Sequence, residues 1–383
     1  MESNYKRLGN YIREIDLRNT NSEYLNLMGV SINKQFIPSV ANIIGTDLSK
    51  YKVISKNQFA CSLMQVSRDG GIAISLYKDS NKAIMSPAYY IFEIIDDKQL
   101  MPEYLELIVY NPEFDREAVF NAIGGVRGTL TWEDFCDMKV NIPDITEQEK
   151  IVRQYKTITD RIGVLEKINE ELENIASLVI NNMYAEKECN HKIADYCEDM
   201  IGGDWGKEEE NGNYKSFVTC IRGADIPYFN QGIITTAPKR YIISKNLISR
   251  KIKPGNLIIE MSGGTVTQAT GRVACASEEN LHGLDVICSN FCRLLKVKEG
   301  YEYIIFEIWK KLYREDVMFS YENGTSGLKN FEIDNFINEV DIYISDNATM
   351  INQQLKDIYA AVHRNGLEIE TLSKLKRQIV SRL

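Results

Sequence analysis

The chain has 383 residues, of which 44% are hydrophobic and 26% charged, and its formal net charge is −9. This composition excludes disordered and collagen-like proteins, and no apolar run approaches the roughly 18 residues that a membrane helix needs. The opening sequence MESNYKRLGNYIRE lacks the apolar segment of a secretory signal, so we expect a cytoplasmic protein. Taken alone, the acidic balance argues against nucleic-acid binding, because affinity for phosphate depends on Lys and Arg.

The eight cysteines are spread along the chain without C-x2-C pairs, which predicts reduced thiols and no disulfide framework. Cys189, His191 and Cys197 could begin a metal site, but no second pair follows at zinc-finger spacing. We therefore expect no bound metal.

Residues 1–144 are predicted to form a first mixed α/β domain. The domain as a whole is acidic, but the window between Asp47 and Asp69 contains no acidic residue. The basic residues in this window are Lys50, Lys52, Lys56 and Arg68. A basic stripe on an otherwise acidic domain is what a surface that faces phosphate requires, because such contacts are local. A glycine-rich loop with the sequence GGVRGTLTWEDF follows at Gly124–Phe135.

Residues 145–187 are predicted to form a long helix. Apolar residues recur at alternating steps of three and four along it, with Asn169 at one inward position, and the positions are Ile158, Ile162, Leu165, Leu172 and Val179. This heptad pattern indicates a helix that packs against a partner helix along its length. Thr146, with Glu149 three residues later, predicts a capping box at its start.

Residues 188–346 are predicted to form a second mixed α/β domain, with a strand at Leu257–Met261 and a helix at Tyr303–Leu312. A second acid-free window lies between Asp225 and Glu260, and its basic residues are Lys239, Arg240, Lys245, Arg250, Lys251 and Lys253. A second glycine-rich loop, NGTSGLKNFEIDNF, follows at Asn323–Phe336.

Residues 347–383 are predicted to form a second long helix, with Asn365 and Lys376 at inward positions. Its seam consists of Leu355, Ile358, Val362, Ile369, Leu372 and Ile379. The simplest way to bury both seams is an antiparallel intramolecular coiled coil. Two ordinary amphipathic helices, each packed on a globular core, are the alternative.

The two halves form an internal repeat with a period of about 200 residues. Besides the two loops and helices, Tyr51–Ala60 parallels Arg250–Ile259, and Gly70–Ala73 parallels Gly271–Ala274. The predicted fold is therefore α+β, with two domains separated by two long helices and related by a pseudo-two-fold repeat.

Catalytic motifs are missing from the sequence. No Walker A, H-E-x-x-H, G-x-S-x-G or EF-hand pattern occurs, and the three histidines are scattered. Asn111-Pro112-Glu113-Phe114 approaches the motif with which amino-methyltransferases hold a flipped base, but Glu113 replaces a proline. We interpret it as a helix-start turn and expect a protein without catalytic activity.

Three segments of the first half together resemble the specificity (S) subunit of type I restriction–modification systems. They are the loop Gly124–Leu130, the run Val140–Pro143 and the start of the helix, Thr146–Val152, with its Glu-Gln pair. The order of domain, helix, domain and helix matches that family over the whole chain. The second copy, Ser345–Ile351, lacks the proline and the Glu-Gln pair.

The resemblance implies a non-catalytic subunit in which each domain reads one half of a split, asymmetric double-stranded DNA target. It implies that the paired helices set the distance between the halves and dock two methyltransferase subunits, to which restriction subunits can be added. S-adenosylmethionine, ATP and Mg²⁺ are then expected on those partners and not on this chain.

Base reading is expected from side chains with hydrogen-bonding groups in the loops, and phosphate binding from the acid-free windows. The candidates for base reading are Gln65, Arg68, Arg127 and Thr129 in the first domain and Arg222, Gln268, Arg272, Ser326 and Lys329 in the second. A coiled-coil adaptor without a nucleic-acid role and a free-standing DNA methyltransferase are the alternative functions.

Overall fold

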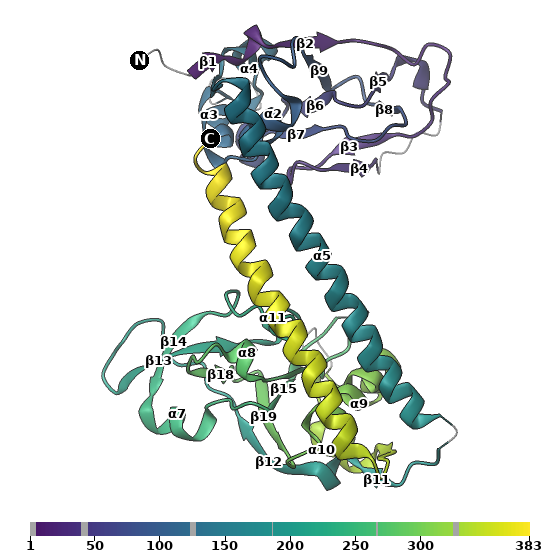
Figure 1. The fold of residues 1–383 in the computed structure, drawn as a ribbon, viewed down its shortest axis with the longest axis vertical. Coiled ribbons are helices and arrows are strands. Elements are labelled where there is room, and N and C mark those ends of the chain that lie inside the picture. Colours follow the sequence, from purple (N-terminus) through teal and green to yellow (C-terminus); the bar gives the residue numbers. More distant parts are fainter. Residues whose placement is uncertain (1–4, 40–44, 123–127, 186, 266, 325–328) are drawn as a thin grey trace. The chain divides into compact units, whose positions relative to one another are not determined.

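The structure is a computed structural model that describes residues 5–39, 45–122, 128–185, 187–265, 267–324 and 329–383. The chain divides into two compact units (Figure 1). Unit 1 comprises Met1–Asp160 and Ser373–Leu383, and unit 2 comprises Arg161–Leu372. No helix in the described ranges is long and apolar enough to cross a membrane.

Unit 1 is built around the four-stranded antiparallel sheet β2-β9-β6-β7, which α2 to α4 accompany. Its core stacks Phe59 on Phe92 at 5.1 Å and packs Phe135 against Phe92. The strands are β1 (Tyr5–Arg7), β2 (Ile12–Ile15), β3 (Met28–Val30), β4 (Phe36–Pro38), β5 (Lys52–Ile54), β6 (Phe59–Ser62), β7 (Ala73–Leu76), β8 (Ala83–Met85), β9 (Tyr90–Ile94) and β10 (Lys139–Asn141). The helices are α1 (Val66–Asp69), α2 (Pro102–Val109), α3 (Pro112–Ala122), α4 (Trp132–Asp137) and the start of α5 (Ile145–Tyr184).

Unit 2 is built around the four-stranded sheet β12-β19-β15-β17, with the smaller sheets β14-β13-β18 and β16-β21-β20 beside it. The strands are β11 (His191–Lys192), β12 (Cys197–Gly202), β13 (Tyr214–Ile221), β14 (Lys239–Ile243), β15 (Leu257–Glu260), β16 (Ser262–Gly263), β17 (Val273–Cys275), β18 (Val286–Cys288), β19 (Cys292–Val297), β20 (Glu322–Asn323), β21 (Lys329–Phe331) and β22 (Asp341–Ile342). The helices are α6 (Ile226–Asn230), α7 (Ser244–Arg250), α8 (Glu278–Leu281), α9 (Glu302–Arg314), α10 (Ile333–Glu339) and α11 (Ala348–Val380).

The internal repeat is confirmed by the order of the strands in the two main sheets. β2-β9-β6-β7 in unit 1 corresponds to β12-β19-β15-β17 in unit 2, and each sheet is followed along the chain by a helix, α2 or α9. The matched segments Tyr51–Ala60 and Arg250–Ile259 lead into the equivalent strands β6 and β15. The two domains therefore share a topology that their divergent sequences only partly reveal.

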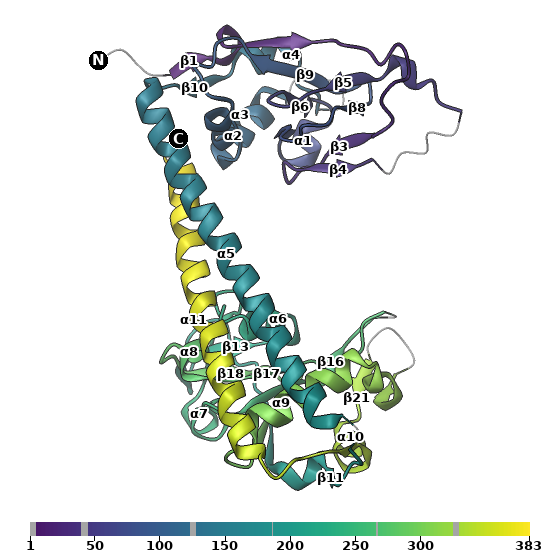
Figure 2. The ribbon, with the colours of Figure 1, turned by 45° about the vertical axis from the view of Figure 1, so that its right-hand side comes forward.

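The two long helices are antiparallel, as expected, and their contacts within unit 2 show the register (Figure 2). Arg161 of α5 donates two hydrogen bonds to Glu368 of α11, at 2.7 and 3.1 Å. Asn365 donates to the side chain of Asn169 at 2.8 Å, so the two asparagines predicted to face inward meet. Asn169 is 2% exposed, and it also donates to the Val362 carbonyl, which leaves its amide well satisfied.

The seam is packed unevenly along the helices. Leu165, Leu355 and Val362 are buried, and Leu355 also belongs to the core of unit 2 together with residues of α9. Both predicted arrangements, the helix pair and packing on a globular core, therefore occur in α11. The other predicted seam residues are partly buried, and they are Ile158, Ile162, Leu172, Val179, Ile358, Ile369, Leu372 and Ile379.

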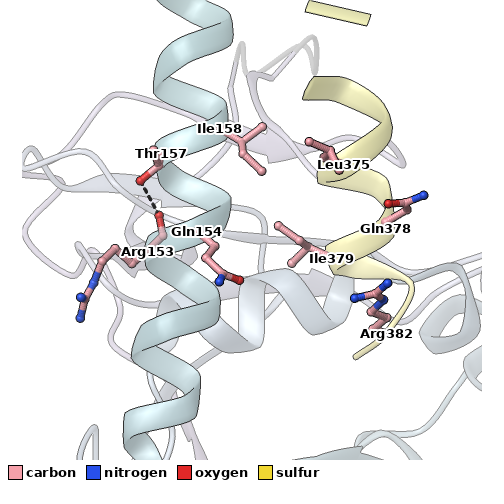
Figure 3. Close-up of a pocket in the computed structure, with 8 residues that line it drawn as sticks. All are labelled: Arg153, Gln154, Thr157, Ile158, Leu375, Gln378, Ile379 and Arg382. Carbon is pink, nitrogen blue, oxygen red and sulfur yellow. Dashed lines mark hydrogen bonds between the residues drawn. The ribbon is translucent and has the colours of Figure 1, made fainter. Parts of the chain in front are cut away.

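Within unit 1, a cavity of about 450 Å³ separates the two helices. Ile158 of α5 points toward Leu375 and Ile379 of α11 across this cavity (Figure 3). Lys376, expected to face inward, lies with its ammonium 4.9 Å from the centre of the Tyr155 ring. The apolar side chains of Ile158, Leu375 and Ile379 thus line a cavity with polar side chains around it, and the two helices do not pack closely here.

The start of α5 differs from the predicted capping box. The helix begins at Ile145, and the carboxylate of Asp144 accepts a hydrogen bond from the Glu147 N–H at 3.1 Å. Thr146 therefore lies inside the helix, and its assignment as N-cap was wrong. Asp144, two residues before Thr146, supplies the carboxylate acceptor at the helix start, and aspartate is among the preferred N-cap residues.

Each long helix is joined to its domain by a buried side-chain amide near the start of the helix. Gln148 of α5 is fully buried; its Oε1 accepts from the Met101 N–H at 3.0 Å, at the start of α2, and its Nε2 donates to the carbonyls of Gln99 and Pro143. Asn352 of α11 is 5% exposed, and its Oδ1 accepts from the N–H groups of Tyr303 and Ile304, at the start of α9. Both halves of the repeat therefore contain a hydrogen bond from a helix-start N–H to a buried amide oxygen, supplied by Gln148 in one half and by Asn352 in the other.

Two glycines in the long helices allow a matched test of this packing. A Cβ at Gly366 would lie 1.5 Å from the Gln231 carbonyl oxygen, whereas one at Gly163 would have nothing within 4 Å. We expect Gly366→Ala to lower the free energy of unfolding by roughly 3 kcal/mol, because α11 must move away from this turn. Gly163→Ala should raise it by about 0.5–1 kcal/mol. Denaturant titration of both full-length variants measures the difference, and equal effects would contradict the described contact.

Candidate nucleic-acid interface

In unit 1 the end of the glycine-rich loop packs directly on the short helix α1. A Cβ at Gly128 would lie 1.8 Å from Ser67 Oγ, and the Leu130 N–H donates to the Leu63 carbonyl at 2.9 Å. This contact brings together the chain segments that carry Gln65, Arg68 and Thr129. The sequence had placed these three candidates in two separate loops.

Gln65 has a left-handed backbone, with φ of +62°, immediately before α1. A non-glycine residue in this region is uncommon, and such strained positions gather at functional sites. Arg68 is exposed over 68% of its side chain and donates to its neighbour Asp69. The segment Gln65–Asp69 thus presents an amide and a guanidinium beside the loop end.

Of the three lysines of unit 1 that the sequence suggested for phosphate binding, two are exposed and one is buried. Lys50 and Lys56 are exposed, and Lys50 lies 3.7 Å from Asp47. Lys52 is 5% exposed, and its ammonium lies 3.2 Å from Glu14 and over the Tyr90 ring, so it cannot reach a phosphate. Its place inside β5, with the side chain directed into the domain, is the physical reason for this correction. Arg127 lies outside the described residues.

In unit 2 three candidates line one cleft of about 560 Å³, between the ends of the main sheet and β16. They are Arg222, Gln268 and Arg272, and Gln268 is exposed to solvent. Other lining residues, which sequence reasoning missed, are Trp205, Glu260, Asn290 and Phe291. The cleft therefore combines cationic, amide and aromatic groups, which are the groups that contact base edges and base faces in DNA.

Each arginine of the cleft is held by a buried carboxylate. Arg272 donates from Nε and Nη2 to the two oxygens of Glu260, at 2.8 and 2.5 Å. Arg222 donates from Nε and Nη2 to Asp225 in the same way, at 2.8 and 3.0 Å. These hydrogen bonds raise the pKa of both guanidinium groups, so both remain charged at any physiological pH.

Glycines make room for this arrangement. A Cβ at Gly223 would lie 2.5 Å from Glu260 Oε1, and one at Gly263 would lie 2.8 Å from the same atom. Gly203 approaches the Ser289 carbonyl oxygen so closely that its Cβ would lie 2.0 Å away. Gly223, Gly263 and Gly264 line the cleft itself.

Most of the basic candidates in the second acid-free window interact with other side chains or backbone groups of unit 2. Lys239 donates to Thr219 Oγ1 at 2.6 Å, and burial lowers the pKa of its ammonium. Arg240 is 7% exposed, and its guanidinium lies 3.9 Å from the centre of the Trp205 ring. Arg240 therefore supports an aromatic side chain of the cleft and is not itself available to phosphate.

The last candidates also have partners within unit 2. Arg250 donates to the Gly202 carbonyl at 2.9 Å, and Lys251 forms an ion pair with Asp285. Lys329 of β21 forms an ion pair with Glu322 at 2.6 Å, beside β16. Ser326 lies outside the described residues.

Trp205 and Phe291 are exposed over 36% and 52% of their surface, which is high for large aromatic side chains. The only sequence signal for Trp205 is the glycine pair that precedes it. Phe291 follows Asn290 between β18 and β19, where no pattern marks it. A solvent-exposed aromatic pair in a cleft is a feature of the tertiary structure that periodicity does not detect.

No group of three or more His, Cys, Asp or Glu residues that could hold a metal ion is found among the residues that the structure describes. All eight cysteines are described, and all are free thiols. Asn111 caps α3, since its Oδ1 accepts from the Glu113 N–H at 3.0 Å, and it is 8% exposed. The methyltransferase-like turn is thus a helix start, as interpreted from the sequence.

His363 of α11 is buried in unit 2, with 1% exposure. Its Nδ1 lies 2.7 Å from Ser277 Oγ, and its Nε2 lies 3.4 Å from the Asn280 amide nitrogen. Burial lowers the pKa of the imidazole to about 4. This serine–histidine contact is closed off from solvent and joins α11 to α8.

Comparison with known proteins gives one curated relative and one informative solved structure. The chain is 22% identical, over 186 residues, to the specificity subunit of the type I restriction enzyme HindI of Haemophilus influenzae; the match covers 47% of this chain and 40% of the relative. The crystal structure of a type I restriction–modification S subunit from M. genitalium aligns with a TM-score of 0.56 and 11% identity, covering 98% of this chain and 94% of that one. No protein-family model matches the chain.

The chain therefore has the fold of a type I S subunit over nearly its whole length. The resemblance indicated by the loop, the Val140–Pro143 run and the helix start is confirmed. The match spans about two fifths of the length of that curated relative.

The buried imidazole predicts a pH dependence of stability. The pKa of His363 falls from an unfolded value near 6.5 to about 4, so the unfolded chain binds the extra proton first. The stability of unit 2 should be complete above about pH 6.5 and decrease by up to about 3 kcal/mol as the pH falls toward 4. Unfolding measured between pH 7 and 4 should show a shallower slope for His363→Gln. An unchanged slope would refute this origin.

Proposed function

We propose that this chain is the DNA specificity subunit of a type I restriction–modification system. It recognises a split, asymmetric double-stranded DNA target and docks methyltransferase subunits, to which restriction subunits can be added. The observation that carries the proposal is the architecture: two domains of one sheet topology, each joined to its own long helix by a buried amide, with the helices antiparallel. The fold shared with an S subunit supports it.

Each unit supplies a group of side chains suited to base edges. Unit 1 has Gln65 and Arg68 beside the loop end, and unit 2 has the cleft with Arg222, Gln268 and Arg272. Because the two groups differ in composition, we expect each unit to prefer a different half-site. The paired helices then act as the spacer, at about 1.5 Å per residue.

The catalytic chemistry belongs to the partner subunits. In this scheme the methyltransferase subunits bind S-adenosylmethionine, restriction subunits use ATP and Mg²⁺, and the complex works in the cytoplasm. The chain supplies sequence recognition and attachment. Asn111 and the Ser277–His363 pair are buried and take no part in this scheme.

An apolar stripe on α5 is the proposed docking surface for a methyltransferase subunit. Val164, Ile168, Ile175 and Leu178 follow one another at heptad-like steps within unit 2 and are 42–58% exposed. They lie beside the seam residues Leu165 and Leu172, on the more exposed side of the helix. Single exposed apolar residues are ordinary, but four on one helix face indicate a partner.

Binding to split DNA tests the recognition role. We expect the full chain with its methyltransferase subunit to shift a selected split duplex in a gel, and Arg68→Ala to weaken that binding about tenfold or more. Lys98→Ala, which removes an exposed charge from the turn before α2, serves as the control and should change little. Equal binding to random duplexes would reject sequence recognition and favour the adaptor function.

Disruption of the stripe tests the docking role. Ile168→Asp with Leu178→Asp should reduce association with the methyltransferase subunit at least about tenfold, because apolar contacts near an interface centre dominate its affinity. Ile248→Asp on α7, a residue 85% exposed in the same unit, is the matched control. Analytical ultracentrifugation of the mixed subunits measures association. Undiminished association of the double variant would exclude this surface.

A further inference from the structure

We infer that unit 2 reads guanine in its half of the DNA target through Arg222 and Arg272, each of them oriented by a buried carboxylate. This inference rests on the proposed function and specifies the bases that the cleft takes. It is carried by the geometry of two carboxylate–guanidinium pairs that line one cleft.

The two pairs are exposed unequally between their members. The Glu260 and Asp225 side chains are 3% and 2% exposed, whereas Arg272 and Arg222 are 21% and 43% exposed. Each guanidinium therefore lies between a buried carboxylate and the cleft.

The hydrogen bonds leave one defined edge of each guanidinium for a ligand. Nε and Nη2 donate to the carboxylates, and Nη1 of neither arginine donates a hydrogen bond to the described residues. In Arg272 the end formed by Nη1 and the second Nη2 hydrogen presents two parallel donors, whereas in Arg222 the Thr236 carbonyl takes that Nη2 hydrogen and Nη1 remains. Guanine is the base that offers two adjacent acceptors, O6 and N7, at its major-groove edge.

Charge distinguishes this role from phosphate binding. A guanidinium paired with a carboxylate has a local net charge near zero, which weakens its attraction for a phosphate but leaves its donors directed. Lysines and arginines without such partners are the better phosphate ligands. The pairs of the cleft therefore suit a neutral acceptor edge.

The carboxylates also fix the arginines before DNA binds. Gly223 and Gly263 leave no room for a Cβ beside Glu260, and Arg222 is held additionally by the Thr236 carbonyl at 3.2 Å. An arginine that is already oriented loses less side-chain freedom on binding. The glycines of this cleft thus contribute to specificity by positioning Glu260.

The experiment selects bound sequences from a pool of random double-stranded DNA with the full chain and its methyltransferase subunit, at several salt concentrations. Arg272→Lys and Arg222→Lys keep the charge but lose the oriented guanidinium donors, and each should lower the preference for guanine at one position about tenfold. Both positions should lie in the same half of the split sequence. Glu260→Gln should lower the preference for guanine at the position that Arg272 reads.

The salt dependence of binding gives a second readout. We expect the slope of log affinity against log salt to stay unchanged in Arg272→Gln, whereas loss of a phosphate contact would reduce it by about one. Arg161→Lys, which alters the equally bidentate pair with Glu368 on the long helices, is the control and should change no base preference. Thermal unfolding and circular dichroism verify that each variant folds.

The outcomes separate the inference from the proposed function. If the wild-type chain enriches no split sequence, the proposed function fails. If it does, but both lysine variants retain every guanine preference, the inference alone fails. A lower salt slope with unchanged base preferences would assign the arginines to phosphate and also overturn it.

Discussion

The rest of the structure depends on one type of contact, a buried amide side chain that joins each long helix to its domain. Gln148 satisfies the Met101 N–H at the start of α2, and Asn352 satisfies two N–H groups at the start of α9. The first N–H groups of a helix have no partner within it, and leaving them buried and unpaired costs about 1–3 kcal/mol each. The amide thus fixes how each domain sits on its own helix.

A second polar contact gives the helix pair its register. Apolar seams tolerate sliding, whereas the Asn169–Asn365 hydrogen bond is satisfied in one alignment only. Around it, Gly366 lets α11 approach the Gln231–Gly232 turn of the domain. The helices therefore pair with each other and also contribute to the core of a domain.

The acidic total is compatible with DNA recognition because charge acts locally. The structure also shows that basic windows in a sequence overestimate the basic surface. Lys52 and Arg240 are buried, and Lys239 and Lys251 bind groups of their own domain. What remains at the candidate sites is a small set of guanidinium and amide groups, more suited to reading bases than to neutralising phosphates.

The sequence by itself determined the repeat, the two long helices and their inward asparagines, because helical periodicity and spacing are local properties of the chain. It also indicated Arg222, Gln268 and Arg272 as candidates. Only the tertiary structure decided that these three share a cleft, that Glu260 lies behind Arg272, and that Asn352 makes in the second half a contact like that of Gln148 in the first. Those contacts join residues far apart in the chain, and burial and hydrogen-bond partners across such distances leave no periodic trace in the sequence.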